Sequence, residues 1–210
     1  MPDLDTTADV RADARRNRRQ LIVAAREAIA SRGLDVSALD IATAAGVGVG
    51  TLYRRFGTKD SLLDAVVVGL YDEMLDSAQE CLRIEDPWEG LTRFVMELAG
   101  AHRDSRGVAE VTAACDLPPI PEISERTKAL QDAVIQLTDR AHTAGALRAD
   151  VTWQDVMIGS RAGLDTDHCL GVDAGPDGWR RVITLLIDGM RSPGYTPLSG
   201  ASPHLHDNNS

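Results

Sequence analysis

Side chains suited to binding phosphate groups and base edges gather in one short segment of this sequence. Residues 39–63 read LDIATAAGVGVGTLYRRFGTKDSLL, and their hydroxyl, guanidinium and ammonium groups include those of Thr51, Tyr53, Arg54, Arg55 and Lys59. Guanidinium and ammonium groups neutralise phosphate charge, and hydroxyl groups donate hydrogen bonds to phosphate oxygens or base edges. This combination predicts binding to a nucleic acid.

The same segment and the rest of the chain lack the sequence signatures of common enzymes. The glycines of residues 46–50 (GVGVG) precede no Lys-Ser or Lys-Thr pair and follow a predicted helix, so they do not form a phosphate-binding loop. No GxSxG, GxGxxG or HExxH motif occurs. His204 and His206 form an HxH pair, but they lie in a tail expected to be disordered. We therefore expect no enzymatic activity, no cofactor and no metal site.

Charge is distributed unevenly along the chain. The whole chain carries −10, whereas residues 11–59 contain ten Arg or Lys and four Asp or Glu, which makes that segment +6 and leaves −16 for the remainder. A basic module on an acidic body indicates a DNA-facing domain. Arg15, Arg16 and Arg19 could lie along phosphates or in a minor groove. The alternative for this arm is a solvated start of a helix.

Local signals around the segment predict three helices and the start of a fourth. Periodic apolar residues favour a helix over 11–32, with Gly33 as its stop, and Ser37 can cap a short helix through Ala45. Gly46 allows a sharp turn before a second short helix over 49–55. Thr58 can cap a long helix that reaches about Leu82. Helix, glycine turn and helix suit a helix-turn-helix, whose second helix enters the major groove.

Each short helix of this motif has an expected inner and outer side. Leu39, Ile41 and Ala42 of the first are expected to face inward. In the second, Val47, Leu52 and Phe56 are expected to pack inward, which leaves Val49, Thr51, Tyr53, Arg54 and Arg55 for the outer side. The ring of Tyr53 could also be an aromatic of the core, while its hydroxyl reaches a phosphate.

Five stretches within and beside this segment form a specific pattern: residues 40–42 (DIA), 45–47 (AGV), 50–56 (GTLYRRF), Lys59 and 62–63 (LL). The pattern, over roughly residues 15–65, resembles the DNA-binding domain of the TetR/AcrR family of transcriptional regulators. The resemblance implies that the second short helix reads DNA. The residues expected to contact DNA are Arg15, Arg16, Arg19, Gly48, Val49, Thr51, Tyr53, Arg54, Arg55 and Lys59.

Two departures from the family pattern affect which residues read the bases. Gly48 stands where the family usually has a serine that caps the second helix, and Ala38-Leu39 stand where the preceding helix often starts with polar or basic residues. We therefore expect sequence readout to depend on Thr51, Arg54 and the arginine arm rather than on the preceding helix.

The remainder of the chain predicts six further helices and no β-strand. They cover about 59–82, 87–102, 107–115, 123–145, 152–170 and 177–191. The predicted fold is all-α with about nine helices. The predicted organisation is a disordered tail at 1–10, a helix-turn-helix domain at 11–58, a helical ligand-binding and dimerisation domain at 59–192, and a flexible tail at 193–210.

The last two predicted helices offer a dimer interface. Two helix-turn-helix motifs must lie about 34 Å apart to enter successive major-groove turns, which requires two copies of the chain. An apolar stripe and small residues suited to a four-helix bundle are formed by Gly159, Ala162, Gly163, Trp179, Val182, Ile183, Leu186 and Met190. Packing within one chain is the alternative for these residues.

The middle helices are expected to enclose an effector pocket. Mostly apolar residues with a few polar anchors could line it, namely Trp88, Phe94, Val95, Leu98, His102, Val111, Cys115, Val134, Leu137, Met157 and Arg161. Ordinary core packing is the alternative for each. The resemblance implies a homodimeric repressor that leaves a pseudo-palindromic double-stranded operator when a small, largely apolar effector binds. A dimeric DNA-binding regulator without a ligand, controlled by a protein partner or by abundance, is the other hypothesis.

Neither a membrane segment nor a disulfide framework is expected. No apolar run approaches the roughly 20 residues that span a bilayer, and Asp3, Asp5 and Asp9 stand where a signal peptide is basic. We expect a cytoplasmic protein. The three cysteines, Cys81, Cys115 and Cys169, are widely spaced and form no CxxC motif. They are expected to be buried apolar residues, with a redox-sensing pair as the alternative.

Overall fold

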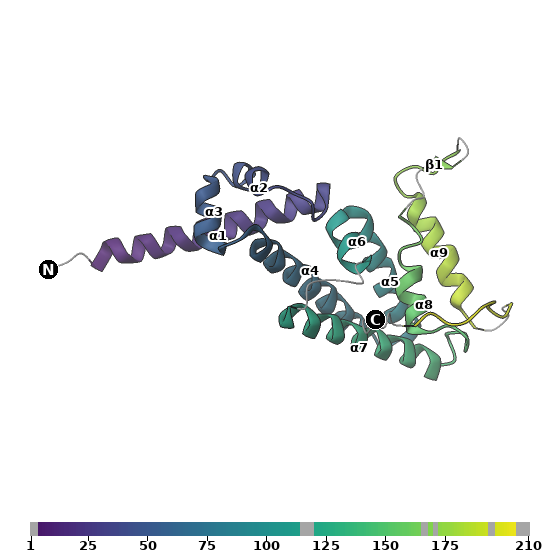
Figure 1. Ribbon diagram of the computed structural model, residues 1–210. Helices are drawn as coiled ribbons and strands as arrows, with labels where there is room; N and C mark the ends of the chain where they lie inside the picture. The colour runs from purple at the N-terminus through teal and green to yellow at the C-terminus, as the bar shows by residue number, and fades with distance from the viewer. Residues whose placement is uncertain (1–3, 114–119, 165–167, 170–171, 193–195, 205–210) are drawn as a thin grey trace. The chain divides into compact units, whose positions relative to one another are not determined.

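The computed structural model describes residues 4–113, 120–164, 168–169, 172–192 and 196–204, with side chains from Arg16 onward except in the two short strands. Within these residues the chain forms nine α-helices and two strands of two residues each (Figure 1). The prediction of an all-α fold with about nine helices is confirmed. The strands were not predicted: β1 (His168–Cys169) pairs antiparallel with β2 (Val172–Asp173).

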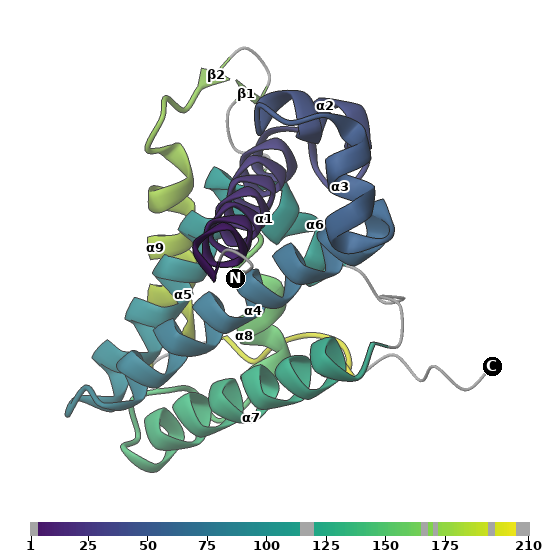
Figure 2. The same cartoon turned by 90° about the vertical axis from the view of Figure 1, so that its left-hand side faces the viewer.

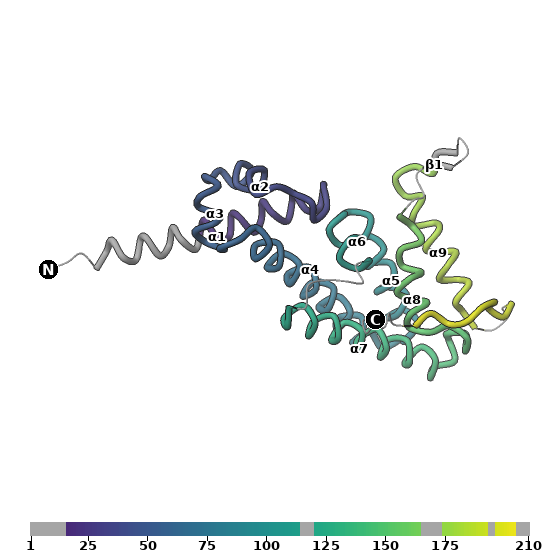
Figure 3. Tube along the Cα trace, viewed as in Figure 1, coloured from purple at the N-terminus to yellow at the C-terminus, as the bar shows by residue number. Residues whose placement is uncertain are grey.

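The chain divides into two compact units, which are described separately here. The first contains residues 1–70 and 105–112, and the second contains residues 71–104 and 113–210. Figure 3 traces the chain through both. The division differs from the predicted boundary after residue 58, because the first half of α4 (Lys59–Leu82) and most of α6 (Arg106–Ala113) belong with the N-terminal helices.

The first helix is longer than predicted. α1 spans Leu4–Arg32 and therefore begins within the tail that was expected to be disordered, seven residues before Arg11. The correction has a simple reason: residues 3–32 contain no glycine or proline, so nothing breaks the helix once its packed part has formed. The helix ends where predicted, because Gly33 takes the left-handed conformation with φ +79°.

α2 (Ala38–Ala44) and α3 (Val49–Phe56) complete the N-terminal motif. In the view of Figure 2, which looks nearly along α1, both helices lie on one side of it. The core of this unit consists of fully buried aliphatic side chains from α1 to α4, including Leu21, Ala25, Ile29, Ile41, Leu52 and Leu62. Burying each large side chain contributes about 1.5–3 kcal/mol, so this small core fixes the angle between α2 and α3.

α6 packs closely against the end of α1. A Cβ atom added at Gly107 would stand 2.2 Å from Cγ2 of Ile29, so only glycine permits this approach of the two helices. One helical turn later, the carboxylate of Glu110 accepts a hydrogen bond from the backbone N–H of Leu34 at 2.6 Å. Glu110 also forms an ion pair with Arg106. These contacts explain why residues 105–112 cluster with the N-terminal unit.

The second unit is built around α5 (Pro87–Asp104), which packs against α7 (Pro121–Thr143) and α9 (Gly178–Met190). Asp86 caps α5, since its carboxylate accepts from the backbone N–H of Trp88 at 2.8 Å. The core side chains are aliphatic or aromatic and come from all three helices, namely Leu91, Phe94, Val95, Leu98, Val134, Leu137 and Ile183.

α8 (Trp153–Gly159) is shorter than the predicted helix over 152–170. Its start agrees with the prediction. Thr152 and Asp155 form a reciprocal capping box, which fixes the first turn of the helix. After Gly159 the chain continues in tight turns, with i to i−3 hydrogen bonds from the N–H groups of Arg161, Ala162 and Leu164. Gly163 in these turns lies against Trp179 and Ile183. Glycine has a low helix propensity. Together with the close packing of Gly163 against α9, this explains why α8 ends before this segment.

A buried arginine attaches the segment after α9. The guanidinium of Arg148 forms a two-pronged ion pair with Asp150 and donates to the carbonyl oxygens of Gly189 and Thr196, at 3.0 and 2.6 Å. Asp150 in turn accepts from the backbone N–H of Leu198 at 2.9 Å. The predicted flexible tail at 193–210 thus includes two positions that are hydrogen bonded to the body of the second unit.

Candidate nucleic-acid interface

The turn between α2 and α3 is fixed by local hydrogen bonds. The hydroxyl of Ser37 accepts from the backbone N–H of Asp40 at 3.1 Å and caps α2, as predicted. Gly46 adopts φ +68°, and the N–H of Val47 donates to the carbonyl of Ala42 at 3.0 Å. Gly48 begins α3 without a side-chain cap. The backbone therefore holds the two helices as a helix-turn-helix with little help from side chains at the start of α3.

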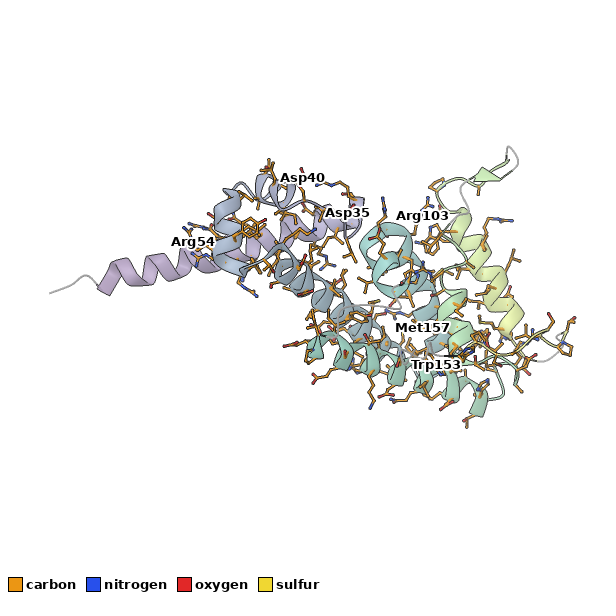
Figure 4. All side chains as sticks on the ribbon, viewed as in Figure 1. Asp35, Asp40, Arg54, Arg103, Trp153 and Met157 are labelled. Carbon is orange, nitrogen blue, oxygen red and sulfur yellow. The ribbon has the colours of Figure 1, made fainter. Side chains whose placement is uncertain are left out.

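α3 has one buried anchor and an exposed face. Leu52 is fully buried, whereas Tyr53 and Val49 are 48% and 37% exposed. Arg54 is exposed and projects from the outer side of α3 (Figure 4), and Thr51 is half-buried. This placement agrees with the outer residues expected from the sequence. It leaves a phenol hydroxyl, a guanidinium and aliphatic groups on a surface that none of the described side chains of the first unit covers.

Two further cations lie where α3 meets α4. Lys59 is half-buried and its Nζ donates to the carbonyl oxygen of Val36 at 3.1 Å, which ties the start of α4 to the loop before α2. Arg55 is also half-buried, and its Nε is buried without a hydrogen-bond partner in the described part of the chain. Lys59 therefore holds the start of α4 against the loop before α2, besides contributing a positive charge. The guanidinium of Arg55 keeps one N–H group, that of Nε, without a hydrogen-bond acceptor among the described residues.

The predicted arginine arm lies on α1. Arg16 and Arg19 are exposed, and the guanidinium of Arg18 stands over the ring of Phe56, 5.3 Å from its centroid. The side chain of Arg15 lies outside the described residues. The contact between Arg18 and Phe56 joins this part of α1 to the end of α3, so the arm belongs to the same basic surface.

One residue at this surface was misassigned from the sequence. Leu39 was expected to face inward, but it is 64% exposed, while Ile41 and Ala42 are buried as predicted. Consecutive helix residues differ by about 100°, so Leu39 and Ile41 point to nearly opposite sides and cannot both reach the core. That spacing, read strictly, would have placed Leu39 on the outer side.

The predicted pocket residues lie mostly in the cores of the two units. Trp88, Met157 and Arg161 are half-buried, and Cys115 lies outside the described residues. Val111 is buried on α6 in the first unit. The buried members on α5 and α7 in the second unit are Phe94, Val95, Leu98, His102, Val134 and Leu137. An open hollow of about 480 Å³ is lined by Pro87 and by Gln136, Asp139, Arg140, Thr143 and Ala144, none of which was predicted to line the pocket.

The predicted dimer residues divide between the interior and the surface of the second unit. Trp179, Ile183 and Met190 are buried within their own chain, as is Gly163. Gly159, Val182 and Leu186 are half-buried, and Ala162 is exposed. Two large apolar residues that the sequence prediction omitted are highly exposed here: Ile158 on α8 at 61% and Leu185 on α9 at 71%. The α9 stripe thus packs α9 onto its own chain, while Ile158 on α8 and Leu185 on α9 stay exposed.

His102 and Cys81 are buried titratable groups of the second unit. Burial lowers the pKa of His102 to about 4, although its Nδ1 lies 3.4 Å from the carbonyl oxygen of Ser160. Burial raises the pKa of the Cys81 thiol to about 11, so this cysteine is an unreactive thiol at neutral pH. The expectation of a buried cysteine is confirmed for Cys81. Cys115 and the side chain of Cys169 lie outside the described residues.

Among the residues that the structure describes, no cluster of three His, Cys, Asp or Glu side chains could hold a metal ion. None of the described helices is both long enough and apolar enough to cross a bilayer.

Two family models match the chain. Residues 21–66 match the bacterial regulatory proteins of the tetR family, and residues 86–192 match the C-terminal domain of SbtR-like transcriptional regulators. The first match contains α2, α3 and the start of α4, and the second alone covers half of the chain.

Individual relatives agree with these models. An HTH-type transcriptional regulator of Staphylococcus aureus is 37% identical over 81 residues, which cover 37% of this chain and 42% of that protein. The match therefore spans less than half the length of this curated relative. A TetR transcription regulatory protein of Mycobacterium vanbaalenii is 28% identical, with a TM-score of 0.59 and coverage of 87% and 99% of the two chains. A TetR transcriptional regulator of Streptomyces coelicolor is 27% identical, with a TM-score of 0.58 and coverage of 84% and 99%.

These relatives are transcriptional regulators and not enzymes, which confirms the predicted family and the predicted absence of catalysis. The chain belongs to the TetR family of bacterial DNA-binding transcriptional regulators.

Proposed function

We propose that this regulator binds a pseudo-palindromic operator as a homodimer, represses transcription there, and leaves the DNA when a small, largely apolar effector binds. The observation that carries the DNA contact is the exposed face of α3, where Tyr53 and Arg54 stand beside the half-buried Arg55. In a helix-turn-helix this helix lies in the major groove, and its side chains reach base edges while flanking cations meet phosphates.

The exposed groups of α3 suit different contacts. Arg54 is exposed on the outer side of the helix, and a guanidinium can form two parallel hydrogen bonds with guanine. Tyr53 is partly packed and offers a hydroxyl to a phosphate. The Nζ of Lys59 is held at the Val36 carbonyl, so its charge contributes from a fixed place. We assign hydrogen-bond readout of the bases to Arg54 and Thr51, and orientation on the DNA backbone to Arg55, Lys59 and Tyr53.

Replacing Arg54 by alanine is expected to weaken binding to the preferred duplex by about five- to hundredfold and to relax the preference at one base pair, because one base contact contributes about 1–3 kcal/mol. The preferred duplex would be selected from a random library with the full-length protein. Fluorescence anisotropy at one fixed salt concentration would then give the affinities, since phosphate contacts make them depend on salt.

Arg83→Ala is the matched control, because it removes an exposed arginine from the second unit. This variant should bind within about twofold of the unchanged protein, since Arg83 lies outside the helix-turn-helix that is proposed to contact DNA. Equal affinity of Arg54→Ala and the control for the selected duplex would contradict the assignment of α3 as the recognition helix.

The exposed apolar face of α8 and α9 supports the dimer. Leu186 of α9 lies against Gly159 of α8, and this contact packs the two helices together. The exposed Ile158 directly precedes Gly159, and the exposed Leu185 directly precedes Leu186. Large apolar groups exposed on a protein surface are typical of protein–protein contacts. A symmetric four-helix contact of two chains would cover both side chains and place the two recognition helices on one duplex.

Support for the effector comes from the middle helices. α5 and α7 bring a buried imidazole, His102, into a core that is otherwise apolar, and effector pockets combine apolar walls with few polar groups. The alternative is a dimeric regulator without a ligand, controlled by a protein partner or by abundance.

A thermal-shift screen of the full-length protein distinguishes them. Straight-chain alkanoic acids and fused-ring aromatic compounds serve as probes. A compound present at a hundred times its dissociation constant should add about 2.7 kcal/mol and raise the melting temperature by about 5–10 °C. The same compound should lower the affinity for the selected duplex. Absence of any shift across both compound classes would favour the regulator without a ligand.

A further inference from the structure

Two aliphatic side chains stand exposed at the beginnings of the two helices of the helix-turn-helix. Leu39 is the second residue of α2, and Val49 is the first residue of α3. Both are among the few large apolar residues that the described chain leaves in water. A single exposed leucine is ordinary on a protein surface. This pair differs because a helix-turn-helix directs the start of its recognition helix toward base edges.

The polar groups beside Leu39 are already engaged within the chain. The hydroxyl of Ser37 accepts the backbone N–H of Asp40 at 3.1 Å. The carboxylate of Asp40 forms an ion pair with Arg32 at 3.1 Å, and a carboxylate would in any case repel phosphate. Ala38 contributes only a methyl group. The first turn of α2 therefore offers aliphatic groups, and no free amide or guanidinium, to a groove.

The first turn of α3 has the same character. Gly48 and Gly50 flank Val49, and apart from their chain neighbours and the backbone of α3 itself, no atom lies within 4 Å of the place where a Cβ would stand at either glycine. The isopropyl group of Val49 is thus the bulk of this turn, and the residue is 37% exposed. The first polar side chain of the helix is Thr51, and the guanidinium of Arg54 follows one turn later.

The major groove of DNA carries one apolar group, the C5-methyl of thymine, which aliphatic side chains contact. Cations on α3, including Arg54 and Arg55, match the negative charge of a duplex laid against this face. We propose that Leu39 and Val49 select thymine in each operator half-site by packing against its C5-methyl group. The inference rests on the proposed contact of the helix-turn-helix with DNA, and, unlike the expectation from the sequence, it gives the first turn of α2 a part in reading the bases.

The test compares thymine with deoxyuridine, which lacks only the methyl group. The duplex selected by the full-length protein is resynthesised with deoxyuridine in place of thymine, one symmetric pair of positions at a time. We expect the unchanged protein to lose about three- to fivefold in affinity for each methyl that it buries, the factor that corresponds to one buried methyl or methylene group. Leu39→Ala should bind the thymine duplex more weakly and should no longer distinguish thymine from deoxyuridine at one of these positions. Val49→Ala should do the same at another.

Leu198→Ala is the matched control, because it shortens an exposed leucine of the second unit whose hydrogen bond to Asp150 uses only the backbone. It should keep both the affinity and the discrimination. Leu39 and Val49 lie at the surface, 64% and 37% exposed, so all variants should remain folded at the temperature of the binding assay, which melting curves check. Equal affinity of the unchanged protein for thymine and deoxyuridine at every position overturns the inference, and specific binding would then still support the regulator. Discrimination that survives in both Leu39→Ala and Val49→Ala also overturns it. If the selection from the random library enriches no duplex, the proposed binding of the helix-turn-helix to DNA is itself contradicted.

Discussion

Replacing Ile158 and Leu185 together by glutamate is expected to turn the proposed dimer into a monomer and to weaken binding to the selected duplex by about 10²- to 10⁴-fold. The size of the effect follows from linkage, because a second recognition helix on the same dimer binds at a high effective concentration once the first is bound. A monomer loses this advantage although its own helix-turn-helix is unchanged.

The physical reason lies in the two exposed positions. Both side chains project from the second unit and are more than half exposed, so glutamate there is well solvated in the separate chain. In an interface the same carboxylates would be buried against apolar groups without partners, which is strongly unfavourable. The substitutions therefore act on association and leave the fold of the chain intact.

Sedimentation velocity and anisotropy binding on the same preparations would measure both effects. Leu198→Glu serves as a control, since it adds a carboxylate at an exposed leucine outside α8 and α9. It should remain dimeric and keep its affinity. A double variant that still sediments as a dimer would show that the two chains associate through another surface.

The helix-turn-helix was predictable because its signals are local. Ser37 as the cap of α2 and Gly46 as the left-handed residue of the turn each act within a few residues of their position in the chain. Leu39 was placed on the wrong side because α2 is only seven residues long. In so short a helix, one misassigned residue is not corrected by further periods of the apolar pattern.

Contacts between segments that lie far apart in the chain could not be predicted from the sequence. The approach of Gly107 to Ile29 and the hydrogen bond of Glu110 to the Leu34 N–H join residues more than seventy positions apart. The α9 stripe shows a related limit. Its period correctly predicts a helix with one apolar face, but that pattern is the same whether the face covers its own chain or a partner. The structure buries Ile183 within the chain and leaves Leu185 exposed.

Lowering the pH from 7.5 to 5 is expected to destabilise the unchanged protein by about 2 kcal/mol more than a His102→Gln variant, given an unfolded histidine pKa of about 6.5. Burial, together with the smaller effect of the neighbouring charge of Arg161, depresses the pKa of His102 in the folded chain to about 4. The sign follows from proton binding. Between about pH 6.5 and 4 the unfolded chain takes up a proton that the folded chain does not, so stability falls as the pH falls. Above about pH 7 both states are neutral at this residue, and the difference vanishes.

Urea denaturation of both proteins at pH 7.5 and at pH 5 measures the effect. Glutamine keeps a neutral polar side chain at the site but does not titrate, and every other acid or base is common to the two proteins. Subtracting the two changes in the free energy of unfolding therefore isolates His102, whatever offset the substitution causes at pH 7.5. Equal losses in the two proteins would mean that the imidazole is protonated as readily in the folded chain as in the unfolded one. Such a result would be incompatible with the structure, in which the imidazole of His102 on α5 is 2% exposed and faces the carbonyl oxygen of Ser160.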